Sequence, residues 1–189
     1  MKKYIIFFTS IIFLNAQAFH GMTLVSPAQG GNGGGGGTFY SYLIDNDLNE
    51  INTWSHPYGA ASMPYLNPDS TLIYPYRVPN PTMSVGGVGG GISKYSWEGD
   101  LLWDYQVSDD TYQHHHDVEP LPNGNILVIA WEKKTASEAY AAGRQSIDNS
   151  LNEMWATAIL ELELVGNDGA NIVWEWHIWD HLIQDEDPD

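Results

Sequence analysis

The residues best suited to chemistry form a run of three histidines followed by an acid, His114-His115-His116-Asp117. A neutral imidazole is a competent nucleophile, and a protonated one donates to an oxyanion or a leaving group near pH 7. The same residue types ligate metal ions, and His114, His116 and Asp117 would suit such a site. A third interpretation is that two of the three histidines only pack or face solvent. The run therefore marks a candidate site.

A second group of candidates lies near the end of the sequence and contains His177, Asp180 and His181. The two histidines are four residues apart, a spacing that suits two metal ligands on one face of a helix. However, apolar residues alternate from 174 to 178 as in a strand, which argues against a helical metal pair. We instead take all three residues as candidate substrate-binding residues at the rim of a site.

Composition excludes several classes of partner and chemistry. The chain has 189 residues, with 24 Asp+Glu against 7 Lys+Arg and a net charge of −17, which repels nucleic acid and anionic membranes. The absence of cysteine excludes disulfides, thiolate zinc sites, Fe–S clusters and cysteine nucleophiles. Apolar residues make up 43% of the chain, too many for a disordered acidic protein. We expect a folded, acidic, aromatic-rich domain without a cofactor or a metal.

The first eighteen residues have the pattern of a secretory signal peptide. Lys2 and Lys3 form a basic start, Tyr4 to Leu14 is an apolar run, and Ala16-Gln17-Ala18 is a small-x-small cleavage site. The apolar run is shorter than the roughly 18–20 residues of a spanning helix, although an uncleaved anchor is the alternative. We expect residues 1–18 to be removed, leaving a secreted, periplasmic protein with no membrane contact. A Gly-rich lead-in over residues 19–38 follows.

The rest of the sequence repeats two kinds of hairpin. Apolar-polar alternation around Gly, Asn and Asp turns predicts hairpins that end on Trp54, Trp103 and Trp174, which we call the Trp hairpins. Between them lie two Pro-turn hairpins, centred on Pro68 and Pro122. Two hairpins make four strands, and four strands every 50 residues or so are typical of a β-propeller blade. The tryptophans are expected to pack between blades.

A short helical insertion interrupts the last period, which lengthens to 71 residues between Trp103 and Trp174. Thr135-Ala136-Ser137-Glu138 is a capping box, and Gly143 is a suitable C-terminal stop. A second box, Ser150-Leu151-Asn152-Glu153, predicts another short turn of helix. If residues 114–116 form a regular strand, His114 and His116 lie on one face and His115 lies on the other.

These patterns predict an all-β fold. Between Phe39 and His177 there are two complete four-stranded blades and half of a third, whereas propellers close with roughly four to eight blades. We therefore expect residues 39–189 to be a partial propeller that belongs to a longer protein. The alternative is that identical chains associate through open blade edges to finish the ring.

Four segments resemble the bacterial arylsulfotransferase family. They are Ser41–Asp47, His114–Asn125, Ala130–Thr135 and Val173–Asp185. The resemblance covers nearly all of the mature chain, and it implies a six-bladed β-propeller exported to the periplasm, with its active site in the central funnel. It also implies transfer of a sulfuryl group from a phenolic sulfate ester to a phenol, through a sulfated histidine and without metal or nucleotide donor. The implied partners are a small aryl sulfate and a phenol acceptor.

The resemblance assigns few catalytic residues. The family has an early histidine followed by aspartate at the entry to a Pro-turn hairpin, which here is His116-Asp117, with His115 as the neighbouring candidate. The family's His-x-Asn pair has no counterpart in this sequence, and its downstream arginine and sulfated histidine are not matched. The chain is therefore expected to lack most of the catalytic set and to be inactive alone. A non-catalytic propeller that acts as a binding or adhesion module, and a metal-dependent propeller enzyme, are the alternatives.

Overall fold

The computed structural model describes residues 20–27 and 37–182. The expected signal peptide, residues 1–18, lies outside this part of the chain, as do most of the Gly-rich tract and residues 183–189. The expected lead-in, residues 19–38, is not free of regular structure, because it contains strand β1 (Thr23–Val25). This short strand pairs with the first Trp hairpin and extends it to three strands.

The described residues are nearly all β, with 52% strand and 6% helix in three antiparallel sheets, which confirms the expected fold class. The first sheet contains β1, β2 (Phe39–Ile44) and β3 (Glu50–His56). The second contains β4 (Tyr65–Leu66), β5 (Leu72–Arg77), β6 (Gly90–Tyr95) and β7 (Leu101–Gln106). The third contains β8 (Tyr112–Pro120), β9 (Ile126–Thr135), β10 (Glu153–Val165) and β11 (Gly169–His177).

Four of the hairpin turns share one geometry. In each five-residue turn, the N–H of the first residue donates to the carbonyl of the fifth. The carbonyl of the first residue accepts from the N–H of the fourth, whose φ is positive. The turns are 45–49, 67–71, 96–100 and 121–125, and their positive-φ residues are Leu48, Ser70, Gly99 and Gly124. This left-handed residue forms the bulge typical of three- to five-residue hairpin loops. The turn chemistry of the sequence therefore predicts both kinds of hairpin correctly.

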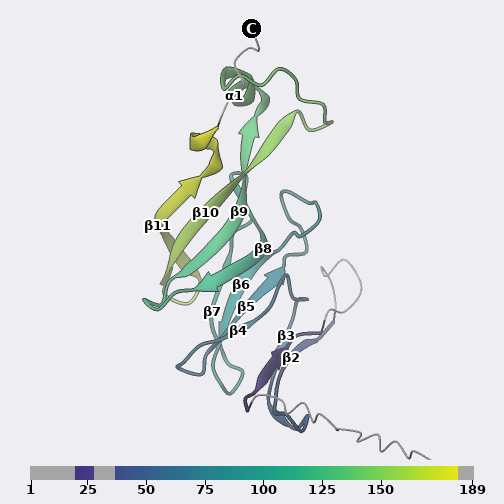
Figure 1. Ribbon diagram of the computed structural model, residues 1–189, viewed down its shortest axis with the longest axis vertical. Coiled ribbons are helices and arrows are strands. Elements are labelled where there is room, and N and C mark those ends of the chain that lie inside the picture. The colour runs from purple at the N-terminus through teal and green to yellow at the C-terminus, as the bar shows by residue number, and fades with distance from the viewer. Residues whose placement is uncertain (1–19, 28–36, 183–189) are drawn as a thin grey trace, which may run out of the picture.

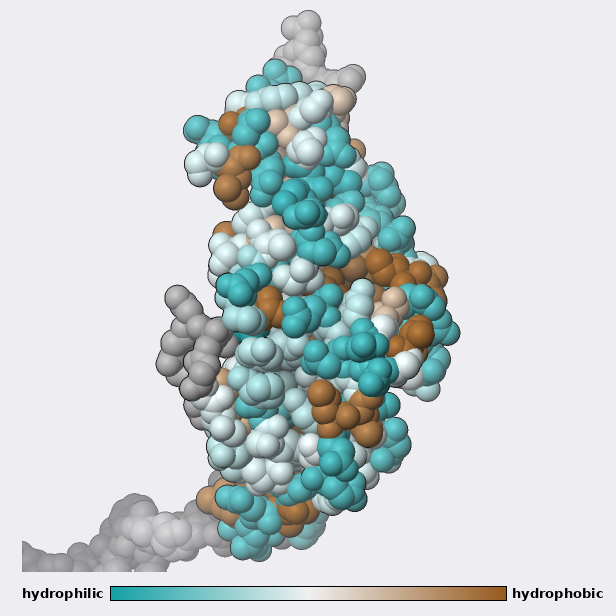
Figure 2. All heavy atoms as spheres, turned by 180° about the vertical axis from the view of Figure 1, so that it is seen from behind, coloured by the Kyte–Doolittle hydropathy of each residue, from teal (hydrophilic) through white to brown (hydrophobic). Residues whose placement is uncertain are grey.

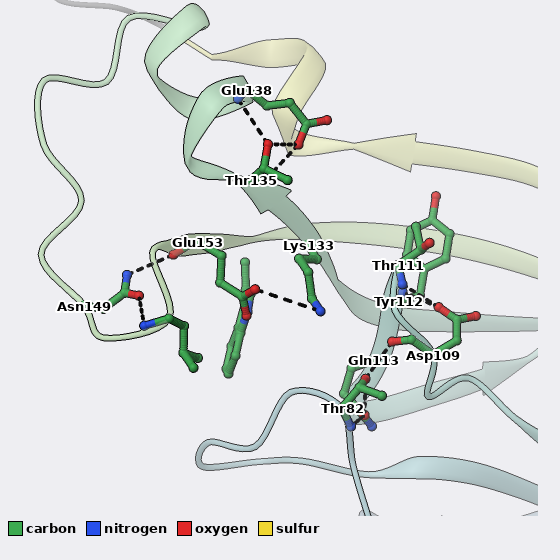
Figure 3. Close-up of polar contacts among 12 residues, drawn as sticks. Thr82, Asp109, Thr111, Tyr112, Gln113, Lys133, Thr135, Glu138, Asn149 and Glu153 are labelled. Atoms are coloured by element: carbon green, nitrogen blue, oxygen red, sulfur yellow. Dashed lines mark hydrogen bonds and ion pairs between the residues drawn. The ribbon is translucent and has the colours of Figure 1, made fainter.

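The insertion forms one helix and not two. Helix α1 (Ala136–Ala141) begins at Thr135, whose hydroxyl accepts from the Glu138 N–H while the Glu138 carboxylate accepts from the Thr135 N–H (Figure 3). The second predicted box is wrong, because residues 150–152 form a turn and β10 begins at Glu153. There the Asn149 amide donates to the Glu153 carbonyl at 2.9 Å, which closes the turn before a helix can start (Figure 3).

The middle sheet is buried on both faces, because each face forms a core with a different neighbour. Strand β5 is therefore buried from Leu72 to Tyr76 without polar alternation, as expected of a strand covered on both sides. The core with the first sheet contains Leu43, Trp54, Leu72, Tyr74, Tyr76, Val78 and Tyr95. The core with the third sheet contains Ile73, Ile92, Trp103, Val118, Ile126, Val128, Ala130, Leu160 and Leu162, among others.

Two of the three tryptophans that end the Trp hairpins join one sheet to the next. The indole N–H of Trp54 in β3 donates to the Ser96 carbonyl of the second sheet at 2.8 Å. That of Trp103 in β7 donates to the Gly169 carbonyl of the third sheet at 2.7 Å. Both side chains are buried, at 0% and 2% exposed, whereas Trp174 in β11 is 49% exposed. The predicted packing between sheets is thus confirmed for two of the three.

Figure 1 shows the sheets one after another along the long axis, from β1–β3 at one end to β8–β11 and α1 at the other. Against the expected two complete four-stranded blades and half of a third, the described residues form two four-stranded sheets and one three-stranded sheet, which is the first. Within residues 20–27 and 37–182, none of the helices has the length and apolar character needed to cross a membrane.

The indole hydrogen bonds predict a measurable loss of stability on a conservative change. Trp54→Phe keeps most of the buried ring but removes the donor to Ser96, and is expected to lower the free energy of unfolding by about 1 kcal/mol. Urea unfolding of dilute protein measures it. Trp174→Phe is the matched control, because this indole is half exposed and its change should fall within about 0.5 kcal/mol of wild type. Equal losses in the two variants would contradict the role assigned to Trp54.

Candidate functional site

The three histidines do not alternate as a regular strand, so the prediction that placed His114 and His116 on one face was wrong. Pairing of β8 with β9 breaks between His114 and Val118, and His116 has a φ of +58°. This left-handed residue turns the backbone, so His114 and His115 are both buried, at 0% and 5% exposed, while His116 faces out. The bulge separates one accessible histidine from two inaccessible ones.

His114 is held by the loop that precedes β6. Its Nδ1 accepts from the Gly90 N–H at 2.9 Å, and its carbonyl accepts from the Gly89 N–H at 3.1 Å. Burial, with the nearby His115, lowers the pKa of His114 to about 4. It is therefore neutral at pH 7, with Nδ1 as the acceptor, and its role is to fix the loop on β8.

His115 supports His116 from behind. Its ring stacks on Trp131 with centroids 4.4 Å apart, and its Nδ1 lies 2.8 Å from the Nδ1 of His116. Burial, with the nearby His116, lowers the pKa of His115 to about 4, so it is neutral at pH 7. One of the two Nδ1 atoms carries the shared proton. This contact therefore couples the orientations and the tautomers of the two rings.

The loop between β5 and β6 packs directly on His116. The Gly87 carbonyl accepts from the His116 N–H at 2.7 Å, and the imidazole lies so close to Gly87 that a Cβ there would overlap the ring. Further along the loop, the Thr82 N–H donates to the Gln113 side chain at 3.0 Å (Figure 3). Gln113 is fully buried and also accepts from Ser108 at 2.7 Å, so the loop is fixed at both ends.

His116 lines a cavity of about 460 Å³, which we call the His116 cavity. Its lining comes from β1, the segment before β4, the end of β5, the loop before β6, and β8. The lining residues are Leu24, Ser26, residues 60–64, Arg77, Gly87, His116 and Asp117. Because β1, β4 and β8 are edge strands of their sheets, the three sheets meet here by the same edge. The joining tryptophans Trp54 and Trp103 lie on the opposite edge strands, β3 and β7.

Arg77 brings a fixed positive charge into the cavity. Its Nε is buried and has no hydrogen-bond partner among the described residues. The guanidinium stays protonated at any physiological pH and presents a planar fork of donors that matches an anionic oxygen pair. Arg77 and His116 therefore place two groups that bind anions in one cavity of a protein with a net charge of −17.

The carboxylate of Asp117 is already occupied by neighbouring donors. It accepts from Ser62 at 2.8 Å, from the Tyr65 hydroxyl at 2.9 Å and from the Val118 N–H at 3.0 Å. Burial and this carboxylate raise the pKa of Tyr65, which stays a donor. Asp117 thus ties the segment before β4 to β8 and shapes the cavity wall.

A chain of hydroxyl groups leads from the cavity into the core between the first two sheets. The Ser26 hydroxyl lies 2.8 Å from that of Ser41, which lies 3.0 Å from Nε2 of His56. His56 is 1% exposed and stacks on Tyr74 with centroids 3.5 Å apart. Burial lowers the pKa of His56 to about 3. This buried histidine was not predicted from the sequence, because its partners come from other strands.

The second predicted group lies elsewhere. His177 contacts Glu132 through Nδ1 at 3.1 Å and Glu175 through Nε2 at 3.5 Å, forming a polar cluster with Lys134. His181 stacks on Trp176, and Asp180 lies in the exposed 3₁₀ turn η1 (Ile178–His181). None of these residues lines the His116 cavity, so the structure does not join them to His116.

Glu132 and Trp131 are consecutive in β9 and so face opposite sides of the third sheet. Because His177 contacts the first and His115 the second, the two predicted groups lie on opposite faces. Within the residues that the structure describes, no three His, Asp or Glu side chains come together as a metal site. The metal-binding interpretation of His114, His116 and Asp117 therefore has no support in the geometry.

Comparison of the chain with known protein families, curated proteins and solved structures finds no match. The site is therefore interpreted from its own geometry. Sequence reasoning missed Arg77, although it is one of only two arginines in an acidic chain and that scarcity was the available signal.

A pair of adjacent glycines tests the packing of the His116 ring. Gly87→Ala is expected to destabilise the protein by about 1–3 kcal/mol, because its Cβ would overlap the imidazole and its φ is +85°. Gly86→Ala is the matched control, since nothing lies within 4 Å of its Cβ position. Urea unfolding measures both. Similar stability of the two variants would show that the loop does not hold His116.

Buried His56 predicts a loss of stability in acid. The pKa is about 3 in the folded state and about 6.5 when unfolded, so below pH 6.5 the unfolded chain binds a proton that the folded one refuses. The contribution of neutral His56 to the free energy of unfolding is complete above pH 6.5. It is lost as the pH falls toward 3, by up to about 1.4 kcal/mol per pH unit.

In His56→Gln the amide can still bond Ser41 but does not titrate, so the plot of unfolding free energy against pH should become shallower below pH 6.5. Exposed His20→Gln serves as the control and should keep the wild-type slope. Denaturant unfolding at a series of pH values measures both. An unchanged slope in His56→Gln would show that this histidine is not buried in its neutral form.

Proposed function

We propose that the His116 cavity binds the sulfate group of a phenolic sulfate ester and that the protein acts as an exported aryl-sulfate sulfotransferase. The observation that carries the proposal is the presence of Arg77 and His116 in one cavity of a strongly acidic protein. The proposal agrees with the function that the resemblance of residues 114–125 to the arylsulfotransferase family implies. Residues 1–18 have the pattern of an export signal, which supports a periplasmic location.

The proposed fold is a β-propeller in which the three sheets are successive blades. Two features support this proposal. The sheets meet by the same edge strands at the cavity, as blades do around a central channel. In addition, Trp54 and Trp103 repeat one contact from each sheet to the next on the opposite edge. In this arrangement the His116 cavity lies on the funnel side.

The proposed chemistry needs donors around a sulfuryl group. Over the whole transfer, the bond from sulfur to the donor phenol's oxygen breaks and a bond from sulfur to the acceptor phenol's oxygen forms. The proton that the acceptor phenol loses ends on the phenolate that leaves. In the transition state the SO₃-like group carries negative charge on three oxygens, which fixed hydrogen-bond donors stabilise. Arg77 supplies a permanent charge for these oxygens, and His116 supplies a donor to a sulfate oxygen or to the leaving phenolate.

His116 is proposed as a donor and not as the sulfated nucleophile, because the resemblance matches it to the family's early histidine. His115 is proposed as the residue that positions it, through the contact between the two Nδ1 atoms at 2.8 Å. The cavity's apolar wall of Leu24, Met63 and Pro64 provides surroundings that suit a phenol ring. His177, Asp180 and His181 are given no role in this site.

Binding tests this proposal without requiring a complete catalytic set. The protein is expected to bind 4-nitrophenyl sulfate more tightly than 4-nitrophenol, because only the ester meets Arg77 and His116 through its sulfate. Arg77→Ala and His116→Ala should each weaken the ester about 10- to 100-fold, the range for one charge-assisted hydrogen bond. Calorimetric titration measures the affinities. His20→Ala, an exposed histidine outside the cavity, is the control.

Equal affinity for the ester and the free phenol would contradict the proposal. If wild type also transfers the sulfuryl group to a phenol, His116→Ala should lower that turnover about 10²-fold. Specific binding without any transfer would favour the alternative of a non-catalytic binding module.

A further inference from the structure

The indole contact that joins successive sheets has a third member that no sheet within the described residues covers. Trp54 and Trp103 each lie in the last strand of a sheet and face the next sheet along the chain. Trp174 lies in the last strand of the third sheet, opposite Glu161 of β10. Its 49% exposure contrasts with the near-complete burial of the other two. The position that joins sheets is thus repeated at Trp174, where the described residues leave it exposed.

The surface around Trp174 is the outer face of the third sheet. Along β9, Ile126, Val128 and Ala130 are buried against the second sheet, while the alternate residues Leu127 and Ile129 face away and are only half buried. These two residues and Ile159 line a hollow of about 190 Å³. Figure 2 shows apolar patches along the edge of the molecule on which β11 lies in Figure 1. The outer face of the third sheet is therefore apolar, like the sheet faces that form the two cores, but no other sheet of the described residues covers it.

The opposite end of the molecule carries the matching acceptor. Trp54 donates to the Ser96 carbonyl, which also accepts from Gly99, the positive-φ residue of its turn. The β2–β3 turn has the same construction, because the Asp45 carbonyl accepts from the positive-φ residue Leu48. The side chains at the first position of the two turns, Asp45 and Ser96, also make the same hydrogen bonds. Each accepts from two backbone N–H groups of its own turn. Asp45 therefore presents the acceptor geometry that Ser96 uses.

The face beside that turn is also apolar. Trp54 and Leu43 point toward the second sheet, so the alternate residues of β1 and β2 point away from it. Among them Val25, Tyr42 and Ile44 are half buried, and Tyr40 is 38% exposed. A donor face at one end and an acceptor face at the other fit each other in a head-to-tail contact.

We propose that this chain associates head to tail with a second copy of itself, with the outer face of β9–β11 packed on the outer face of β1–β2. The indole N–H of Trp174 in one copy donates to the Asp45 carbonyl of the other, as Trp54 donates to Ser96 within the chain. Two copies joined at both ends hold six sheets, within the roughly four to eight that a propeller ring contains. The inference depends on the repeated sheet contact and not on the proposed function.

Sedimentation velocity of the purified protein over a range of concentrations tests this association. The buffer needs moderate salt, because copies with a net charge of −17 repel each other when they are unscreened. Wild type is expected to form a dimer and Trp174→Glu to remain a monomer. Tyr140→Glu is the matched control, since Tyr140 in α1 is 47% exposed and lies away from both faces. It should associate like wild type.

Mixing two variants tests the head-to-tail geometry. Trp174→Glu blocks the donor face and Tyr42→Glu blocks the acceptor face, so each alone should be monomeric. Their mixture retains one intact contact and should form a heterodimer. A symmetric pairing of the two Trp174 faces predicts instead that Tyr42→Glu dimerises alone and that the mixture forms no heterodimer, and that result would overturn the proposal.

Trp174→Phe distinguishes loss of the contact from misfolding, because it keeps an apolar aromatic ring and removes only the N–H donor. It is expected to weaken association about tenfold, the effect of one hydrogen bond. A wild-type monomer at all concentrations, or a Trp174→Glu variant that dimerises normally, would also overturn the proposal. Circular dichroism of each variant confirms that the sheets are intact.

Discussion

The structure depends on the way each sheet is fastened to the next. A single antiparallel sheet in this chain has too few strands to bury its own apolar face, so stability requires a neighbour on that face. Trp54 and Trp103 meet this need in two ways. Each indole fills the core between two sheets, and each donates to a carbonyl of the next sheet. The donor also fixes how far one sheet can slide along the next, and so where their edges meet.

That fixed relation between sheets is what creates the candidate site. The His116 cavity is lined by several separate segments, none of which contains a site alone. The bulge in β8 then selects which histidine reaches it, because the left-handed residue His116 turns out of the strand while His114 and His115 stay buried. The two buried histidines act as supports, one for the loop before β6 and one for the His116 ring.

Electrostatics follow the same logic. The chain carries far more acidic than basic residues, so its general field opposes anions. Binding any anion then requires a local positive charge at short range, and the end of β5 brings Arg77 to the cavity that His116 lines. The carboxylate in the cavity wall, Asp117, accepts from Ser62, Tyr65 and the Val118 N–H, and these donors disperse its charge. The global charge of the protein is therefore a poor guide to the charge of its cavity.

The sequence by itself determined what depends on neighbours along the chain. Alternation, turn residues and the Thr135 capping box predicted the all-β class, the hairpins and helix α1, because these use contacts within a few residues. The same local signal failed at Ser150, where the Asn149 side chain and the start of β10 prevail over the capping pattern. The sequence also pointed to His116. It wrongly predicted His114 and His115 on opposite faces, because a bulge interrupts the alternation of side chains along the strand. Only the tertiary structure brought Arg77 and His116 to one cavity, buried His56 and placed His177 on another face, because those positions depend on which sheet covers which.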